Sequence, residues 1–235
     1  MAAALPNEVT KVPEQATQPS GGGTAEAPST TLPLDPGNGG RSISDSALQT
    51  GDIIVSTTNE FVSKAIRRVT GQPISHSIIY IGDGQIVEAV SDGVILRSIG
   101  EALADAIVAV AFRKPSITPT QAMEVRDYAG QQLNKVYDRL GIFRQVLFQL
   151  ARLAFCSGKT GNEYSQCVNW VGRVNLGSES NDQFFCSELV IAAFEQAGVS
   201  LVATQPHWNT PGDIASLHLS EKLAYVGHLK IELSQ

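Results

Sequence analysis

Apolar runs divide the chain from residue 44 onward into short predicted strands. Residues 52–55 and 107–112 are nearly continuous apolar segments of the length typical of buried strands. Two more apolar stretches flank Gly82-Asp83-Gly84, a glycine-rich turn that predicts a β-hairpin. A last apolar segment at 223–233 predicts a final strand. The pattern therefore predicts a sheet whose strands are mostly antiparallel.

Other segments repeat their apolar residues every three or four positions, which predicts helices with one buried face. This spacing occurs at 58–69 and 141–155. It returns after Cys186, where Gly198 is well placed to end the helix. Because these helices alternate with the short strands, the pattern predicts an α+β domain.

Proline and small polar residues mark two further helix starts. Thr118-Pro119 and Thr210-Pro211 each place a capping side chain before a proline at the first helical position. The first of these helices is predicted to run to about Leu133. Residues 157–182 are rich in Gly, Ser and Asn, so we expect a long loop there, with a helical turn near 168–170.

The first 43 residues differ in composition from the rest. They are rich in Pro, Gly, Ser, Thr and Ala and contain few large apolar side chains. Such a segment cannot bury enough apolar surface to offset its chain entropy, so we predict a disordered tail or linker. Residues 44–235 are then predicted to form one domain, without internal repeats.

Composition and charge exclude several classes of protein. Of the 235 residues, 43% are hydrophobic, which is enough for a sizeable core. No uncharged apolar run reaches about 18 residues, so no transmembrane helix is expected. The net charge of −6 argues against nucleic acid as a partner. The N-terminus lacks the basic and apolar parts of a secretory signal, which predicts a cytoplasmic protein or export to the periplasm by a specialised secretion system.

The cysteines suggest one reactive thiol. Three cysteines are an odd number and show no metal-site spacing, so neither a disulfide scaffold nor a bound metal is expected. Cys156 ends a predicted helix and Cys167 lies in the predicted loop. We interpret both as unpaired structural thiols, with a bridge between them as the alternative in an oxidising compartment.

Cys186 stands at the start of a predicted helix. Unpaired N–H groups and the positive end of the helix dipole favour the thiolate there, which is the nucleophilic form of cysteine. The same N–H groups can hold the oxyanion that forms on an attacked carbonyl. The alternative is a small apolar residue in a helix, because free cysteine is commonly buried.

His76 and Glu88 lie on the two arms of the predicted hairpin. If the hairpin turns about Asp83, Glu88 faces Ile78 and lies diagonal to His76 on the same side of the sheet, within reach of long side chains. Glu88 can then accept the imidazole N–H and orient the ring. A register shift of one residue would separate them, and each alone is more typical of an ordinary strand residue.

Taken together, these segments resemble the circularly permuted papain-like hydrolases. Within them the chain is most similar to the YaeF/YiiX-like branch of the NlpC superfamily, which also includes lecithin:retinol acyltransferase-like enzymes. The similarity covers roughly residues 47–226. The matching segments, in chain order, are Leu48 to Ile54, Ser75 to Gly82, Ile86 to Ala89, Tyr137-Asp138, Phe185 to Val190 and Thr210 to Asp213.

The resemblance implies roles for these residues. Cys186 would be the nucleophile, His76 the general base and then acid, and Glu88 the residue that orients the imidazole. It also implies a barrel-like sheet packed against the Cys186 helix, as in an NlpC-like fold. Candidate substrate contacts are Tyr137, Asp138, Ser187 and Trp208, the last from an aromatic patch beside the cleft. Core packing of Tyr137 and a solvated Asp138 are the alternatives.

The predicted function is hydrolysis of amide bonds through an acyl-enzyme, without metal or organic cofactor. The resemblance implies that the protein is an amidase or endopeptidase and that its substrate is a peptide of the bacterial cell wall. A further hypothesis is a secreted antibacterial effector, whose partners would be secretion machinery and an immunity protein. Two alternatives remain. One is a lipid acyl-ester hydrolase or acyltransferase with the same site, and the other is a binding module without turnover.

Overall fold

The computed structural model describes residues 40–58, 64, 73–137, 139–175 and 183–230. Its main feature is a seven-stranded sheet with the order β1-β9-β6-β2-β3-β4-β5. Within this sheet, as far as the structure describes it, only β1 and β9 pair in parallel, so the predicted antiparallel character is confirmed. The strands are β1 (Ser42–Ile43), β2 (Ile53–Thr58), β3 (His76–Gly82), β4 (Gln85–Val90), β5 (Gly93–Ser98), β6 (Ala106–Arg113) and β9 (Ala224–Leu229).

The sheet is open, so the expected barrel-like closure is wrong. Its two edges are β1 and β5, and no ladder joins them among the described residues. Closure needs a continuous ladder between the edge strands, and the two-residue β1 offers too few backbone groups for one. The architecture is therefore a mixed sheet packed on helices.

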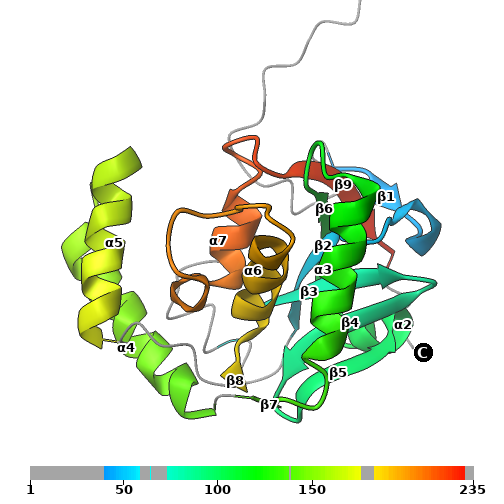
Figure 1. The fold of residues 1–235 in the computed structure, drawn as a ribbon, viewed down its shortest axis with the longest axis horizontal. Helices are drawn as coiled ribbons and strands as arrows, with labels where there is room; N and C mark the ends of the chain where they lie inside the picture. Colours follow the sequence, from blue (N-terminus) through cyan, green and yellow to red (C-terminus); the bar gives the residue numbers. More distant parts are fainter. Residues whose placement is uncertain (1–39, 59–63, 65–72, 138, 176–182, 231–235) are drawn as a thin grey trace, which may run out of the picture.

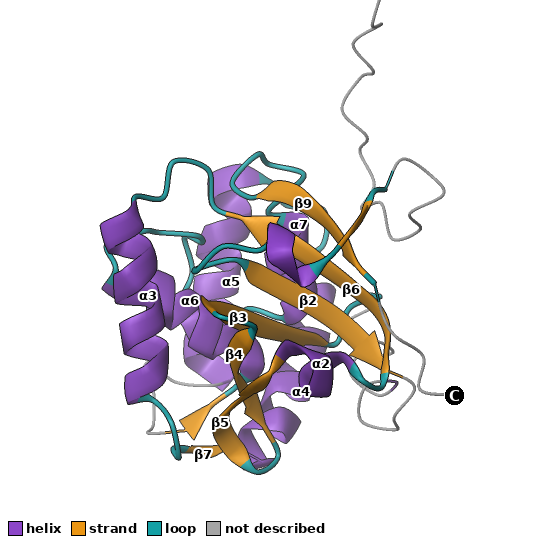
Figure 2. Ribbon diagram, turned by 90° about the vertical axis from the view of Figure 1, so that its right-hand side faces the viewer, coloured by secondary structure: helices purple, strands orange, loops and turns teal. Residues whose placement is uncertain are grey.

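Helices cover both faces of the sheet (Figure 2). Helices α3, α6 and α7 pack on one face, and the short α2 packs on the other. A separate pair, α4 and α5, lies at the left of Figure 1, beyond α6 and α7. The helices are α2 (Ile99–Leu103), α3 (Pro119–Gln131), α4 (Arg139–Cys156), α5 (Gly161–Asn175), α6 (Cys186–Gln196) and α7 (Pro211–Ser216), with 3₁₀ turns η1 (Asp45–Ala47) and η2 (Pro206–Trp208).

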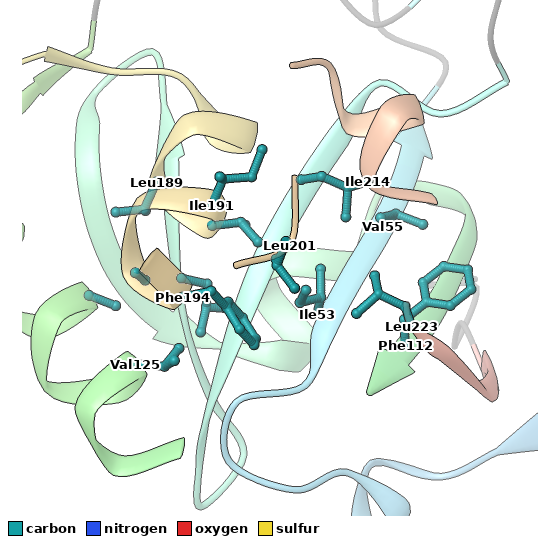
Figure 3. Packing of buried hydrophobic residues seen from close by; sticks show 14 of the residues in the cluster. Ile53, Val55, Phe112, Val125, Leu189, Ile191, Phe194, Leu201, Ile214 and Leu223 are labelled. Atoms are coloured by element: carbon teal, nitrogen blue, oxygen red, sulfur yellow. The ribbon is translucent and has the colours of Figure 1, made fainter. Parts of the chain in front are cut away.

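The alternation of side chains along β2 explains the two cores. Ile53 and Val55 point toward α6 and α7, while Ile54 points toward α2. Figure 3 shows the larger core, in which side chains of α6 such as Leu189 and Phe194 meet those of the sheet. A strand that is buried on both faces reads as a continuous apolar run, which is why residues 52–55 were recognisable.

The predicted helix starts and the hairpin turn are confirmed. Thr118 and Thr210 each accept a hydrogen bond from a backbone N–H in the first turn of the following helix. Asp83 and Gly84 both have positive φ, of 52° and 70°, as a tight two-residue hairpin turn requires. Gly198 follows α6 with φ of 69°. The helix expected at 58–69 lies outside the described residues, apart from Thr58 and Lys64.

The prediction of a long loop at 157–182 is wrong in its first part, because α5 occupies Gly161–Asn175. Its apolar stripe is narrow, and its buried members Val168 and Val171 pack against Phe148 of α4 and Trp208. The polar remainder of the helix conceals this stripe in a single sequence. Residues 176–182 lie outside the described part of the chain.

Cys156 and Cys167 form a disulfide, so their interpretation as free thiols is wrong. The reason is the same helix. Because α4 and α5 run as an antiparallel pair, the two Cα atoms come to 5.8 Å, well within the range of a disulfide. We call residues 139–175, stapled in this way, the α4–α5 hairpin.

The described part of the chain begins slightly before the predicted boundary at residue 44. Ser42 and Ile43 form β1, and Arg41 donates through Nε to the carbonyl of Val226 at 2.6 Å. Residues 1–39, the bulk of the predicted tail, lie outside the described part. No helix among the described residues is long and apolar enough to cross a membrane.

Candidate active site

Cys186 is the first residue of α6 and the one free cysteine of the chain. Phe185, just before it, is extended, and its N–H donates to Glu188 Oε2 at 3.3 Å, which fixes the first turn of the helix. The helix packs on the sheet through Leu189, Val190 and Phe194. Its apolar stripe therefore holds a thiol at an N-terminus, as the sequence predicts.

His76 and Glu88 have the hairpin register expected for them. Tyr80 faces Ile86 and Ile79 faces Val87, and the same register continued places Glu88 diagonal to His76. His76 Nε2 lies 2.5 Å from Glu88 Oε2. The Glu88 side chain is fully buried and that of His76 is 22% exposed. The carboxylate thus holds one ring nitrogen and leaves Nδ1 for the thiol.

The thiol and the imidazole change one another's ionisation. Burial by itself lowers the pKa of His76, but hydrogen bonds to Cys186 and Glu88 outweigh it and raise the pKa of His76 to about 10. Burial likewise raises the pKa of Cys186, yet the hydrogen bond and charge of His76 bring it below the ordinary thiol value. The pair therefore favours a thiolate beside an imidazolium.

Ser77 adds to this effect. Its backbone N–H and its hydroxyl both help to lower the pKa of Cys186. The Ser77 side chain is 1% exposed, and its Oγ has no hydrogen-bond partner within the described residues. Its position next to His76 was the only sequence signal for it.

Arg97 is a site residue that the sequence reasoning missed. Its Nε donates to Glu88 Oε1, so the two oxygens of Glu88 hold one cation each. Burial raises the pKa of Glu88, but His76 and then Arg97 bring it below its usual value. The contact depends on the pairing of β4 with β5. Its register sets Ile95 opposite Glu88 and Arg97 two residues further along the same face.

The structure places the four predicted substrate contacts in different settings. Ser187 is 3% exposed, and its Oγ donates to the carbonyl of Asn209 at 2.6 Å, which ties α6 to the segment after η2. Trp208 is 1% exposed and packs between the helices of the α4–α5 hairpin. Tyr137 ends strand β7, and its side chain lies outside the described atoms, as does Asp138. Substrate contact by these residues remains a prediction.

The α4–α5 hairpin is joined to the chain next to the nucleophile. The strand before it, β7 (Val136–Tyr137), pairs in parallel with β8 (Gln183–Phe184), the strand that leads into Cys186. The hairpin is also fixed to the body by Arg152, which makes two 2.7 Å bonds to Asp213 of α7. The hairpin is therefore tied to the strand that leads into Cys186 and, through Asp213, to α7.

No group of three or more metal-ligating side chains occurs within the described ranges. The carboxylates near the thiol are used in other ways, since Glu88 binds two cations and Glu188 caps α6. What the residues present can do is acyl transfer. They supply a thiolate, a proton donor and helix N–H groups for an oxyanion.

Comparison with known proteins relates the chain to bacterial relatives. It is 30% identical over 196 residues to the probable lipoprotein peptidase YaeF of Escherichia coli (strain K12). This match covers 78% of this chain and 71% of YaeF. Among solved structures it is similar to the metalloprotein YiiX of Escherichia coli O157:H7, at 20% identity and a TM-score of 0.40, over 79% of this chain and 98% of that one. No protein-family model matches the chain.

Proposed function

Because this chain belongs to the YaeF/YiiX-like family, we propose that it is a peptidase-type hydrolase whose nucleophile is Cys186. One observation carries the proposal. The free thiol Cys186 stands at a helix N-terminus, and its pKa is lowered by a neighbouring histidine that a buried carboxylate orients. This set of groups is what nucleophilic thiol catalysis requires.

The reaction proceeds in two steps. The Cys186 thiolate attacks the carbonyl carbon, a C–S bond forms, and the oxyanion is held by N–H groups of the first turn of α6. His76 then gives its proton to the amine as the C–N bond breaks. In the second step His76 takes a proton from water, the hydroxide attacks the acyl-enzyme, and the acid leaves as the thiolate is restored.

Variants of the three residues test this mechanism. Cys186→Ala is expected to abolish hydrolysis, and His76→Ala to lower kcat by about 10²–10⁴-fold. Glu88→Gln, which keeps the shape but loses the charge, is expected to lower kcat less than His76→Ala does. Full activity of Cys186→Ala on a peptide substrate would end the proposal.

The finer proposal is that the substrate is a cell-wall peptide. It rests on the family resemblance, and purified protein with peptidoglycan fragments tests it by mass spectrometry of the products. The disulfide favours action in an oxidising compartment such as the periplasm, because such bonds are rare in the cytosol. Delivery as an antibacterial effector would require an immunity protein that binds this chain, which co-purification from the host can test.

A lipid ester is the second candidate substrate, and one surface observation favours it. The α4–α5 hairpin, which is followed by the strand that leads into Cys186, exposes large apolar side chains on both helices: Leu150, Leu153, Phe155 and Trp170. Such a surface suits an acyl chain better than a polar peptide. Release of fatty acid from phospholipid vesicles, with no cleavage of peptidoglycan fragments, would favour this candidate.

A binding module without turnover is the remaining alternative. It predicts that Cys186 behaves as an ordinary thiol. Iodoacetamide labelling compares the folded protein with the same protein unfolded in urea, since Cys156 and Cys167 are bonded to each other and do not label. Slower labelling in the folded state at neutral pH would support the binding module over the enzyme.

A further inference from the structure

Arg97 stands where it can control the catalytic charge. Glu88 is enclosed on all sides, and the Arg97 guanidinium is the second of its two charged partners. A buried carboxylate stays ionised only when cations and hydrogen bonds balance its desolvation. His76 supplies one partner through Oε2 and Arg97 supplies the other through Oε1.

The surroundings direct Arg97 toward Glu88 rather than elsewhere. Glu101 of α2 is a second carboxylate that interacts with Arg97, but its pKa is lowered most by its bonds with Ser98 and least by Arg97. Glu101 Oε2 accepts both the N–H and the hydroxyl of Ser98, at 2.9 and 2.7 Å, so it is occupied by the cap of its own helix. Arg97 side-chain exposure is 34%, which leaves its outer part in water.

We infer that Arg97 is a positioning residue of the site, completing a relay of Cys186, His76, Glu88 and Arg97. The inference rests on the proposed function of Cys186. With Arg97 present, the thiolate–imidazolium pair and the Glu88–Arg97 pair form a cluster with no net charge. Arg97 also occupies the oxygen of Glu88 that His76 does not use, so the carboxylate cannot rotate away from the imidazole.

The sign of the effect follows from the charges. Removing the cation leaves a net negative buried cluster, and a negative cluster binds protons more tightly. Loss of Arg97 therefore raises the pH at which the Cys186 thiolate forms. The charged groups of the cluster come from β3 (His76), β4 (Glu88) and β5 (Arg97). Beside it lie Glu101 of α2, which acts on Arg97, and Glu188 in the first turn of the Cys186 helix. Only Arg97 is changed.

The test is the pH dependence of Cys186 alkylation by iodoacetamide in the folded, disulfide-intact protein. Arg97→Gln is expected to move the acid midpoint of the alkylation rate upward by about one pH unit, roughly a tenfold loss of rate below that midpoint. Arg97→Lys keeps the charge, so its alkylation midpoint is expected to lie close to that of the wild type. A merely structural role would lower stability without moving the midpoint.

Arg113→Gln is the matched control. Arg113 is similarly half-buried, at 28% side-chain exposure, and binds the buried Asp52 through two nitrogens. That pair sits at the opposite end of β2 from the strand position that pairs with His76. Its loss should reduce thermal stability and leave the alkylation midpoint unchanged.

The outcomes separate this inference from the function on which it rests. An activated Cys186 in the wild type with the same midpoint in Arg97→Gln would overturn the role of Arg97 alone. A midpoint that moves equally in Arg97→Lys and Arg97→Gln would overturn the charge argument. A wild-type thiol no more reactive than glutathione at any pH would overturn both the proposed function and the relay.

Discussion

Cys186 and His76 are each buried enough that each would be neutral if it stood alone. Their hydrogen bond reverses this, because each charged form is the best available partner for the other. Glu88 and Arg97 form a second pair of opposite charges next to the first. The charges of Cys186, His76 and Glu88 therefore depend on one another, and Arg97 supplies the constant cation.

The pH dependence of hydrolysis follows from these pKa shifts. The pKa of Cys186 is lowered, so activity should rise through a pH below the ordinary thiol range as the thiolate forms. The pKa of His76 is raised to about 10, so activity should fall as pH passes that value and the leaving amine loses its proton donor. A kcat/KM profile that rises only near pH 9 would contradict the ion pair.

The sequence allows the three central residues to be proposed because each has a local signal. Cys186 begins an amphipathic helix, and a glycine turn sets the register of His76 against Glu88. Arg97 has no such signal, since it acts across a second hairpin that alternation alone did not reveal. Its role depends on a strand pairing that only the folded sheet displays.

At the scale of elements, the α4–α5 hairpin rests on few contacts with the body. Trp208 enters the space between its helices, and Arg152 holds α7. Gly172 is where this packing is tightest, because a Cβ there would lie 2.3 Å from Trp208 Cε2. Glycine is required at this point by the close approach of the indole. The polar composition of residues 157–182, which predicted a loop, gives no sign that Gly172 contacts Trp208.

Gly172→Ala should therefore loosen the hairpin. The overpacking is expected to cost about 1–3 kcal/mol and to lower Tm by several degrees. In a Trp170→Phe background, which removes the exposed indole, Trp208 emission should shift to longer wavelength. Gly130→Ala in α3 meets nothing within 4 Å and should be neutral or stabilising. Equal effects of the two alanines would contradict the packing argument.

The disulfide is expected to stabilise this hairpin locally. Cys156 and Cys167 are 11 residues apart, and closing a loop of that size contributes about 2–3 kcal/mol. The double variant Cys156→Ala/Cys167→Ala should raise amide hydrogen exchange in α4 and α5. Protection in α3 and β2 should remain. Faster exchange throughout the protein would instead indicate that the bond supports the whole fold.

At the scale of the molecule, the fold class and mostly antiparallel sheet were predictable, but its open form was not. Patterning specifies which residues face a core, and it does so for both faces of β2. It does not specify whether the edges of a sheet meet, since that depends on strand number and pairing over long distances. The two-residue β1, which joins β9, carries too little pattern to be recognised.

Truncation tests where the domain begins. Removal of residues 1–39 should leave Tm and activity unchanged, as the composition of that segment predicts. Removal of residues 1–43 also deletes β1 and the bond from Arg41 to Val226, so it should lower Tm by several degrees. The position of Gly227, whose added Cβ would lie 2.5 Å from Ile43, shows how closely β1 is seated. Identical Tm values for both truncations would contradict an ordered β1.

The short ladder between β7 and β8 joins the two ends of a long insertion that contains α4 and α5. We expect that this insertion can be lengthened, shortened or exchanged, because β8 would still place Phe185 and Cys186 at the same position. We therefore expect that the α4–α5 hairpin can be changed without displacing Cys186. A chimera that carries a foreign helical insert between β7 and β8 should keep a reactive Cys186 thiol and should prefer a different substrate.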